Sequence, residues 1–74
     1  MAHEYDLEGL PARLQRLRQK RGLTQMEVAD AMGVAQPHIS HWESGRSYPK
    51  LGDAARLCKL YGITIDELCG RIDR

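Results

Sequence analysis

Side chains that hydrogen-bond but carry little charge gather in residues 36–44 of this 74-residue chain. Ile39 and Trp42 are three positions apart and would face the inside of a helix, so the polar side chains around them would face outward. The amide of Gln36 can pair in bidentate fashion with the N6 and N7 atoms of adenine. His41, on the same outer side, can donate or accept at a base edge or a phosphate. This face therefore suits recognition by hydrogen bonding.

Residues that could support metal or nucleophilic chemistry are too scattered to form a catalytic site. His38 and His41 could share a metal ion, but no third ligand lies nearby in the sequence. Cys58 and Cys69 lie among aliphatic residues without the spacing of a disulfide scaffold or a zinc knuckle, so we interpret both as reduced core thiols. There is no glycine-rich phosphate loop and no nucleophile on a recognisable elbow. We expect neither an enzyme, nor a cofactor, nor a bound metal.

Charge is nearly balanced over the whole chain but unevenly distributed. The net charge of +1 is by itself a weak argument for nucleic acid. Between residues 13 and 50, three acids stand against seven bases: Arg13, Arg16, Arg18, Lys20, Arg21, Arg46 and Lys50. The middle of the chain is therefore basic. The first eight residues carry three acids and no apolar run, so we expect no signal peptide, no membrane span and a cytoplasmic location.

Two short helices are predicted in the first half of the chain. The first covers about residues 11–21, with Pro11 in its first turn and Gly22 just past its end. Thr24 begins the capping box T-Q-M-E, and Gly33 suits the left-handed residue that ends a second helix of about two turns. The inward-facing residues are Leu10, Leu14 and Leu17 in the first helix, and Val28, Ala29 and Met32 in the second.

Three more helices are predicted in the second half. The third begins at about Gln36, because Pro37 is tolerated in a first turn, and it ends at Gly45. The fourth ends at Gly62, and the capping box T-I-D-E at Thr64 begins a short fifth helix over about residues 65–69. The inward-facing residues of this half are Val34, Ile39, Trp42, Ala54, Leu57, Cys58, Tyr61 and Leu68.

Five helices and no strand predict a compact all-α fold. We expect one domain over residues 10–70, preceded by an N-terminal extension, residues 1–9, and followed by a C-terminal tail, residues 71–74, that frays. Two helices joined by a tight glycine turn can hold the second helix in a DNA major groove while the first crosses the backbone. The second and third helices have this arrangement.

The sequence resembles the lambda-repressor and Cro-like family of helix-turn-helix proteins, also called the XRE family, from about Leu10 to Leu68. The resemblance is carried by R-Q-K-R-G-L-T-Q, by G-L-T-Q-M-E-V-A-D-A-M-G-V-A-Q-P-H-I-S-H-W-E-S-G, by W-E-S-G-R-S-Y-P and by G-I-T-I-D-E-L. It implies a five-helix lambda-repressor-like DNA-binding domain whose helix-turn-helix is formed by the second and third helices. Members of this family are mostly bacterial and phage transcriptional regulators that bind operators as dimers.

Roles for individual residues follow from this resemblance. Gln36, Pro37 and His41 match the base-reading surface, although Pro37 replaces a polar side chain and could make only van der Waals contact. Ala35 stands where relatives often have a serine or threonine cap, which would cost the third helix about 1 kcal/mol. The expected phosphate contacts are Gln25, His38, Ser44, Arg46, Ser47 and Tyr48.

Two further expectations concern contacts between protein groups. Arg18 and Glu43 match a pair that in relatives forms a salt bridge between the first and third helices. Leu60, Ile65 and Ile72 are apolar in a region through which relatives often dimerise, so we expect a homodimer. Scattered apolar surface without a partner is the alternative interpretation.

Two functions from different classes are consistent with the sequence. The first is a transcriptional regulator, a repressor, that binds an inverted-repeat operator in double-stranded DNA with one third helix in each of two major grooves. The second is an antitoxin or adaptor of the same fold whose main partner is a protein. An exposed apolar groove away from the third helix would favour the second.

Overall fold

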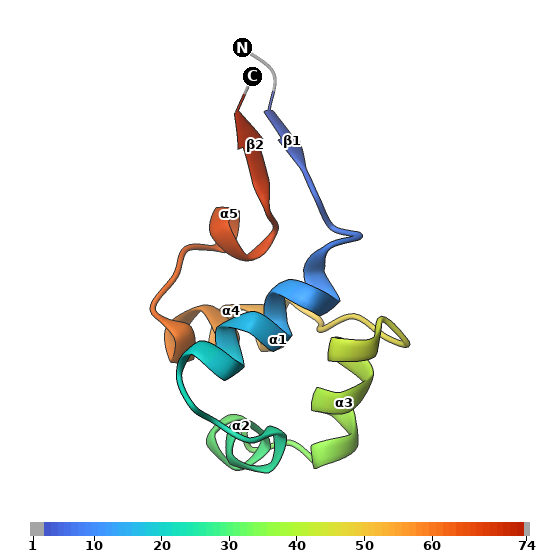
Figure 1. Cartoon of the computed structure of the whole chain (residues 1–74), viewed down its shortest axis with the longest axis vertical. Helices are drawn as coiled ribbons and strands as arrows, with labels where there is room; N and C mark the ends of the chain where they lie inside the picture. The colour runs from blue at the N-terminus through green and yellow to red at the C-terminus, as the bar shows by residue number, and fades with distance from the viewer. Residues whose placement is uncertain (1–2, 74) are drawn as a thin grey trace.

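A computed structural model describes residues 3–73 of the chain. The elements in chain order are β1 (His3–Tyr5), α1 (Leu10–Lys20), α2 (Gln25–Met32), α3 (Gln36–Ser44), α4 (Leu51–Tyr61), α5 (Ile65–Leu68) and β2 (Arg71–Asp73). The five predicted helices are therefore confirmed. In Figure 1 the helices form one body, and α2 and α3 lie at the end opposite the two strands.

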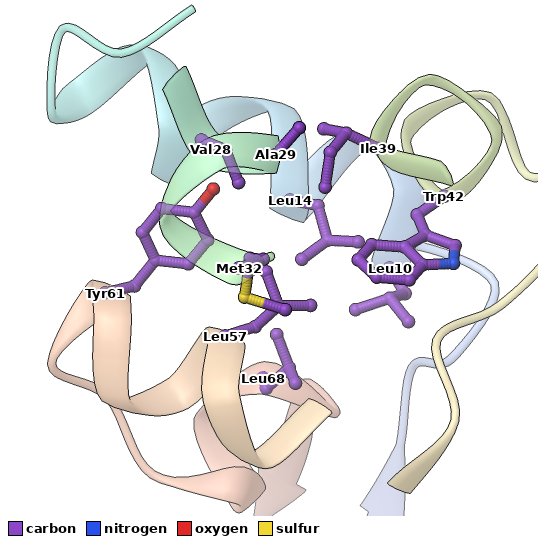
Figure 2. Close-up of a cluster of buried hydrophobic side chains, with 10 residues drawn as sticks. All are labelled: Leu10, Leu14, Val28, Ala29, Met32, Ile39, Trp42, Leu57, Tyr61 and Leu68. Atoms are coloured by element: carbon purple, nitrogen blue, oxygen red, sulfur yellow. The ribbon is translucent and has the colours of Figure 1, made fainter. Parts of the chain in front are cut away.

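Ten side chains from all five helices meet in the core: Leu10, Leu14, Val28, Ala29, Met32, Ile39, Trp42, Leu57, Tyr61 and Leu68 (Figure 2). Each was expected to face inward. Val34, Cys58 and Leu17 are only partly buried and pack against this core. Both thiols are free, as predicted, but Cys69 is half-buried at the end of α5. The apolar periodicity thus predicted the core almost completely.

Capping groups and glycines set the boundaries of α2 and α3. The Thr24 hydroxyl accepts from the Glu27 amide at 3.1 Å, and the Glu27 carboxylate accepts from the Thr24 amide at 2.9 Å, which confirms the first capping box. Gly33 ends α2 with a φ of +70°, a value that favours glycine. Ala35 precedes α3 without a side-chain cap. The turn between α2 and α3 is therefore defined by Gly33 at the end of α2, whereas no side chain caps the start of α3.

The prediction of no strand was wrong at the two ends of the chain. β1 and β2 pair antiparallel, with Tyr5 opposite Arg71 and Glu4 opposite Ile72, and they form a ribbon that projects from the helical body (Figure 1). Residues 71–73, which we expected to fray, belong to this ribbon, and Arg74 lies outside the described residues. Three-residue strands more than sixty positions apart produce no local periodicity, so sequence reasoning could not detect the pairing.

Within residues 3–73, no helix has the length and apolar character needed to cross a membrane.

Candidate nucleic-acid interface

The outer face of α3 consists of the polar residues predicted from the sequence. Ile39 and Trp42 are buried and attach the helix to the core. Pro37 and His38 are exposed, and His41 is half-buried. The ring centroids of His38 and Trp42 are 6.3 Å apart, so this imidazole lies close to the buried indole. The side of α3 that carries Pro37, His38 and His41 is therefore open to a ligand.

Arg18 and Glu43 form a bidentate ion pair between α1 and α3. Arg18 Nε donates to Glu43 Oε2 at 2.8 Å, and Arg18 Nη2 donates to Oε1 at 3.0 Å. The side chains are only 13% and 6% exposed. The hydrogen bond to Glu43 raises the pKa of Arg18, against the desolvation that lowers it. The third nitrogen, Nη1, donates to the carbonyl of Leu23 at 2.9 Å, so the guanidinium also fixes the chain entering α2.

The same carboxylate holds a chain of two glutamines. Gln25 Nε2 donates to Glu43 Oε1 at 3.2 Å, and Gln36 Nε2 donates to Gln25 Oε1 at 2.7 Å. Each amide nitrogen carries two hydrogens, so each glutamine keeps one N–H for another acceptor, and Gln36 also keeps its carbonyl oxygen. From the sequence, Gln25 was expected to contact phosphate and Gln36 to contact bases, and their contact with each other was not predicted. Both occupy the first position of a helix, and that shared placement was the available signal.

The loop after α3 folds back on the end of that helix. The amides of Arg46 and Ser47 donate to the carbonyl of His41 at 3.0 and 3.4 Å, and the Ser44 hydroxyl donates to the same carbonyl at 3.2 Å. The Tyr48 hydroxyl donates to the carbonyl of Leu7 at 3.2 Å. Two of the hydroxyls expected to bind phosphate, Ser44 and Tyr48, thus donate their hydrogens within the protein.

A hollow of about 380 Å³ lies between α3 and this loop. Its lining includes His38, His41, Ser47, Tyr48 and Lys50. Lys50 belongs to the basic middle segment of the sequence but was not predicted to contact a ligand. Within residues 3–73, no group of three or more potential metal ligands is present. Asp53 also lines the hollow, and its carboxylate pairs with Arg56 at 3.6 Å. The hollow thus offers an anionic ligand hydrogen-bond donors and the Lys50 cation, beside one paired carboxylate.

The basic middle segment is less free than its sequence implies. Arg13 donates to the carbonyls of Leu68 and Asp6 at 2.9 and 2.6 Å, and Arg21 donates to the carbonyl of Tyr61 at 2.7 Å. Together with Arg18, three of the arginines thus donate hydrogen bonds to the protein itself, although Arg21 is exposed. Arg16, Lys20, Arg46 and Lys50 are exposed. The cations available to a ligand are therefore fewer than the seven counted in the sequence.

Comparison with known proteins gives a consistent result. A family model described as a helix-turn-helix domain matches residues 10–68. The chain is 41% identical over 56 residues to the HTH-type transcriptional activator BcrR of Enterococcus faecalis, covering 76% of this chain and 28% of BcrR. It is 41% identical to the HTH-type transcriptional regulator DdrOP3 of Deinococcus deserti, covering 76% of this chain and 43% of DdrOP3. The cryptic phage CTXphi transcriptional repressor RstR of Vibrio cholerae is 39% identical over 77% of this chain and 51% of RstR. The chain thus spans at most about half the length of these relatives.

Two solved structures have a similar fold. A transcriptional regulator from Listeria innocua aligns with a TM-score of 0.80 and 24% identity, over 100% of this chain and 64% of its own. SinR, solved in complex with DNA, aligns with a TM-score of 0.74 and 20% identity, over 80% of this chain and 95% of its own. At these identities the likeness shows the fold alone.

Proposed function

The chain belongs to the helix-turn-helix domain family of the lambda-repressor and Cro-like type, and from this premise we propose that it is a sequence-specific, DNA-binding transcriptional regulator. Relatives between 39% and 41% identical are named as transcriptional activators, regulators or repressors. The length of α3, nine residues, suits a recognition helix in the major groove.

The observation that carries this proposal is the half-buried chain of contacts Arg18–Glu43–Gln25–Gln36. It joins α1 and α2 to both the last turn of α3, through Glu43, and its first residue, Gln36, and it leaves Gln36 with one N–H and one carbonyl oxygen. A bidentate contact to adenine needs one donor and one acceptor in that arrangement. Preorganised groups of this kind lose little conformational entropy on binding.

The remaining contacts follow from the positions of their side chains. Pro37 and His41 lie beside Gln36 on the base-reading face, with Pro37 limited to van der Waals contact. Gln25 keeps an N–H at the amino end of α2, where the helix dipole favours a phosphate. The backbone contacts proposed beside Gln25 are His38, Arg46 and Ser47, with Lys50 added from the hollow. Ser44 would contact phosphate only if its hydroxyl turned away from His41.

We further propose that the protein acts as a homodimer on an inverted repeat. Ile65 and Ile72 are 43% and 40% exposed, and half-buried Leu60 lies nearby in sequence on α4. Two copies of α3 would then meet successive major grooves about 34 Å apart. A domain that covers the groove excludes other proteins from it, so we propose repression. Sedimentation at micromolar concentration tests the dimer, and Ile65→Asp should shift it toward monomer.

As part of the same proposal, the protein acts by binding, without catalysis, and is located in the cytoplasm. Function by binding alone needs neither catalysis nor a cofactor. A cytoplasmic location would give the protein access to DNA in a bacterial cell.

One observation favours the alternative of a protein partner. A hollow of about 440 Å³ away from α3 is lined by Ala31, Met32 and Leu60 and flanked by Arg56 and Lys59. An antitoxin or adaptor could use this surface while DNA contact serves autoregulation. Ala31→Glu should then abolish partner binding and leave DNA affinity unchanged, whereas unchanged partner binding would remove this support.

Selection of DNA sites from a random pool, followed by affinity measurements over a range of salt, tests the leading function. We expect Gln36→Ala to reduce discrimination between the selected site and scrambled DNA roughly five- to hundredfold, with non-specific binding retained. Gln15→Ala, an exposed glutamine on α1, is the matched control. Equal loss on all sequences would show that Gln36 only positions the helix. A wild-type chain that binds no DNA at low salt would overturn the function.

A further inference from the structure

The loop after α3 is attached to a segment far away in the sequence. The Tyr48 hydroxyl donates to the backbone carbonyl of Leu7 at 3.2 Å, across 41 positions. A second close approach lies at the start of this loop, where a Cβ added to Gly45 would be 3.4 Å from Pro11 Cγ. The residues before and at the start of α1 thus lie directly against the loop.

The residues that present this carbonyl form a fixed turn, residues 6–9, which we call the N-terminal turn. Asp6 Oδ1 accepts from the Gly9 amide at 3.2 Å, and the carbonyl of Leu7 also accepts from the Leu10 amide at 3.1 Å. A Cβ at Gly9 would overlap Asp6 Oδ2, so the turn is closely packed. Leu7 therefore offers its carbonyl to Tyr48 from a defined position.

Arg13 fastens the N-terminal turn to the rest of the molecule. Its side chain is 15% exposed; Nη2 donates to the Asp6 carbonyl at 2.6 Å and Nε donates to the Leu68 carbonyl at 2.9 Å. The Asp6 amide donates to the carbonyl of Gly70 at 3.0 Å, next to β2. The turn is thus held from α1, from α5 and from the ribbon.

We propose that the N-terminal turn holds the loop of residues 46–50 in the geometry that binds DNA phosphates, and that Tyr48 is a positioning residue rather than a phosphate ligand. This inference rests on the proposed function. A phenol has one hydrogen to donate and phosphate oxygens only accept, so Tyr48 cannot donate to Leu7 and to DNA at once. Fixing the loop before binding lowers the entropy lost when Arg46, Ser47 and Lys50 meet the backbone.

The first measurement is the affinity of the full chain for its selected site. Tyr48→Phe should weaken binding roughly three- to tenfold, the effect expected for one hydrogen bond. Tyr5→Phe is the matched control, because its hydroxyl donates to Asp66 Oδ1 at 3.2 Å within the ribbon and its ring is 48% exposed, against 49% for Tyr48. We expect this control to change affinity less than twofold.

A double-mutant cycle separates positioning from direct contact with phosphate. Asp6→Ala loosens the N-terminal turn, and Glu8→Ala controls for the lost negative charge on an exposed neighbour. If Tyr48 acts through the turn, Tyr48→Phe adds less than twofold to the loss caused by Asp6→Ala. In the free protein, amide hydrogen exchange at residues 46–48 should accelerate in both Tyr48→Phe and Asp6→Ala.

The outcomes distinguish this inference from the proposed function. Losses that multiply independently in the double variant would show a direct phosphate contact and overturn the inference. Specific DNA binding by the wild type, with Tyr48→Phe no weaker than Tyr5→Phe, would overturn the inference alone. A wild-type chain without DNA binding would overturn both.

Discussion

Glu43 belongs to α3 but accepts hydrogen bonds from Arg18 on α1 and from Gln25 on α2. At the scale of single residues, its carboxylate therefore adds a polar link from α3 to both of these helices, beside the apolar packing of Ile39 and Trp42. Its removal would leave the Arg18 guanidinium, 13% exposed, without its anionic partner. A buried charge in that state is costly, so the effect should be seen in both stability and binding.

Replacing Glu43 with glutamine keeps the shape of the side chain and removes its charge. We expect Glu43→Gln to lower the free energy of unfolding by about 1–3 kcal/mol and to weaken specific DNA binding. Chemical denaturation and a binding titration measure the two effects. Glu8→Gln, on an exposed residue, is the control, and a Glu43→Gln variant indistinguishable from it would contradict a structural role for the pair.

Because of Tyr61, the free energy of unfolding should change with pH in the alkaline range. Burial raises the pKa of its hydroxyl to about 12 from the ordinary value of 10.0. Between these values the folded state holds more protons than the unfolded state, so the stabilisation present below pH 10 is lost as the pH rises toward 12. We expect denaturation midpoints to fall over this range in the wild type and to fall less in Tyr61→Phe. Parallel pH profiles for the two proteins would be inconsistent with this prediction.

At the scale of elements, α2 and α3 differ in how their starts are stabilised. Thr24 and Glu27 cap α2 reciprocally, whereas Ala35 gives α3 no side-chain cap. The backbone of Ala35 already has the extended conformation of a capping residue, with φ −73° and ψ 144°. Pro37 has no amide hydrogen and the His38 amide donates to the Ala35 carbonyl at 3.0 Å, so a serine hydroxyl at position 35 would share the His38 amide with that carbonyl.

Ala35→Ser should therefore raise the free energy of unfolding by about 0.5–1 kcal/mol, because its hydroxyl can accept from the His38 amide, which it shares with the carbonyl of residue 35. Thermal or chemical denaturation measures the change. Ala55→Ser, at an exposed interior position of α4, is the control, and it should be neutral or slightly destabilising. A gain no larger in Ala35→Ser than in this control would argue against the missing cap.

At the scale of the whole molecule, the two ends of the chain are joined to each other and to α1. The ribbon pairs β1 with β2, and Arg13 bonds to the carbonyl of Asp6, before α1, and to that of Leu68, in α5. Gly70 is where these contacts meet. Its φ is +71°, and a Cβ there would overlap the Arg13 guanidinium, whose Cζ would be 2.7 Å away.

Two glycine substitutions should change stability in opposite directions. Gly70→Ala should lower the free energy of unfolding by about 1–3 kcal/mol, since it strains the backbone and displaces Arg13. Gly52→Ala, in α4, meets no atom within 4 Å and should raise it by about 0.5 kcal/mol through helix propensity. Unfolding curves of both variants measure whether stability falls in Gly70→Ala and rises in Gly52→Ala. A neutral Gly70→Ala would show that the terminal contacts add nothing to stability.

The sequence by itself determined the five helices, their capping boxes and nearly all of the core. Those features depend on apolar spacing and on side chains three positions apart, and such signals are local. It also identified the polar face of α3, because Ile39 and Trp42 fix which side turns inward. The helical framework of the candidate site was therefore predictable.

Only the tertiary structure decided which polar groups meet. The pairing of β1 with β2, the use of Arg13 and Arg21 inside the fold, and the contact of Gln25 with Gln36 each join distant positions. A single hydrogen bond between distant residues leaves no periodic pattern in the sequence. A charged residue is also the same residue type in the sequence whether its side chain is free or bonded in the fold. From the sequence, Tyr48 was only an expected phosphate contact, and its bond to Leu7 exists only once the chain is folded.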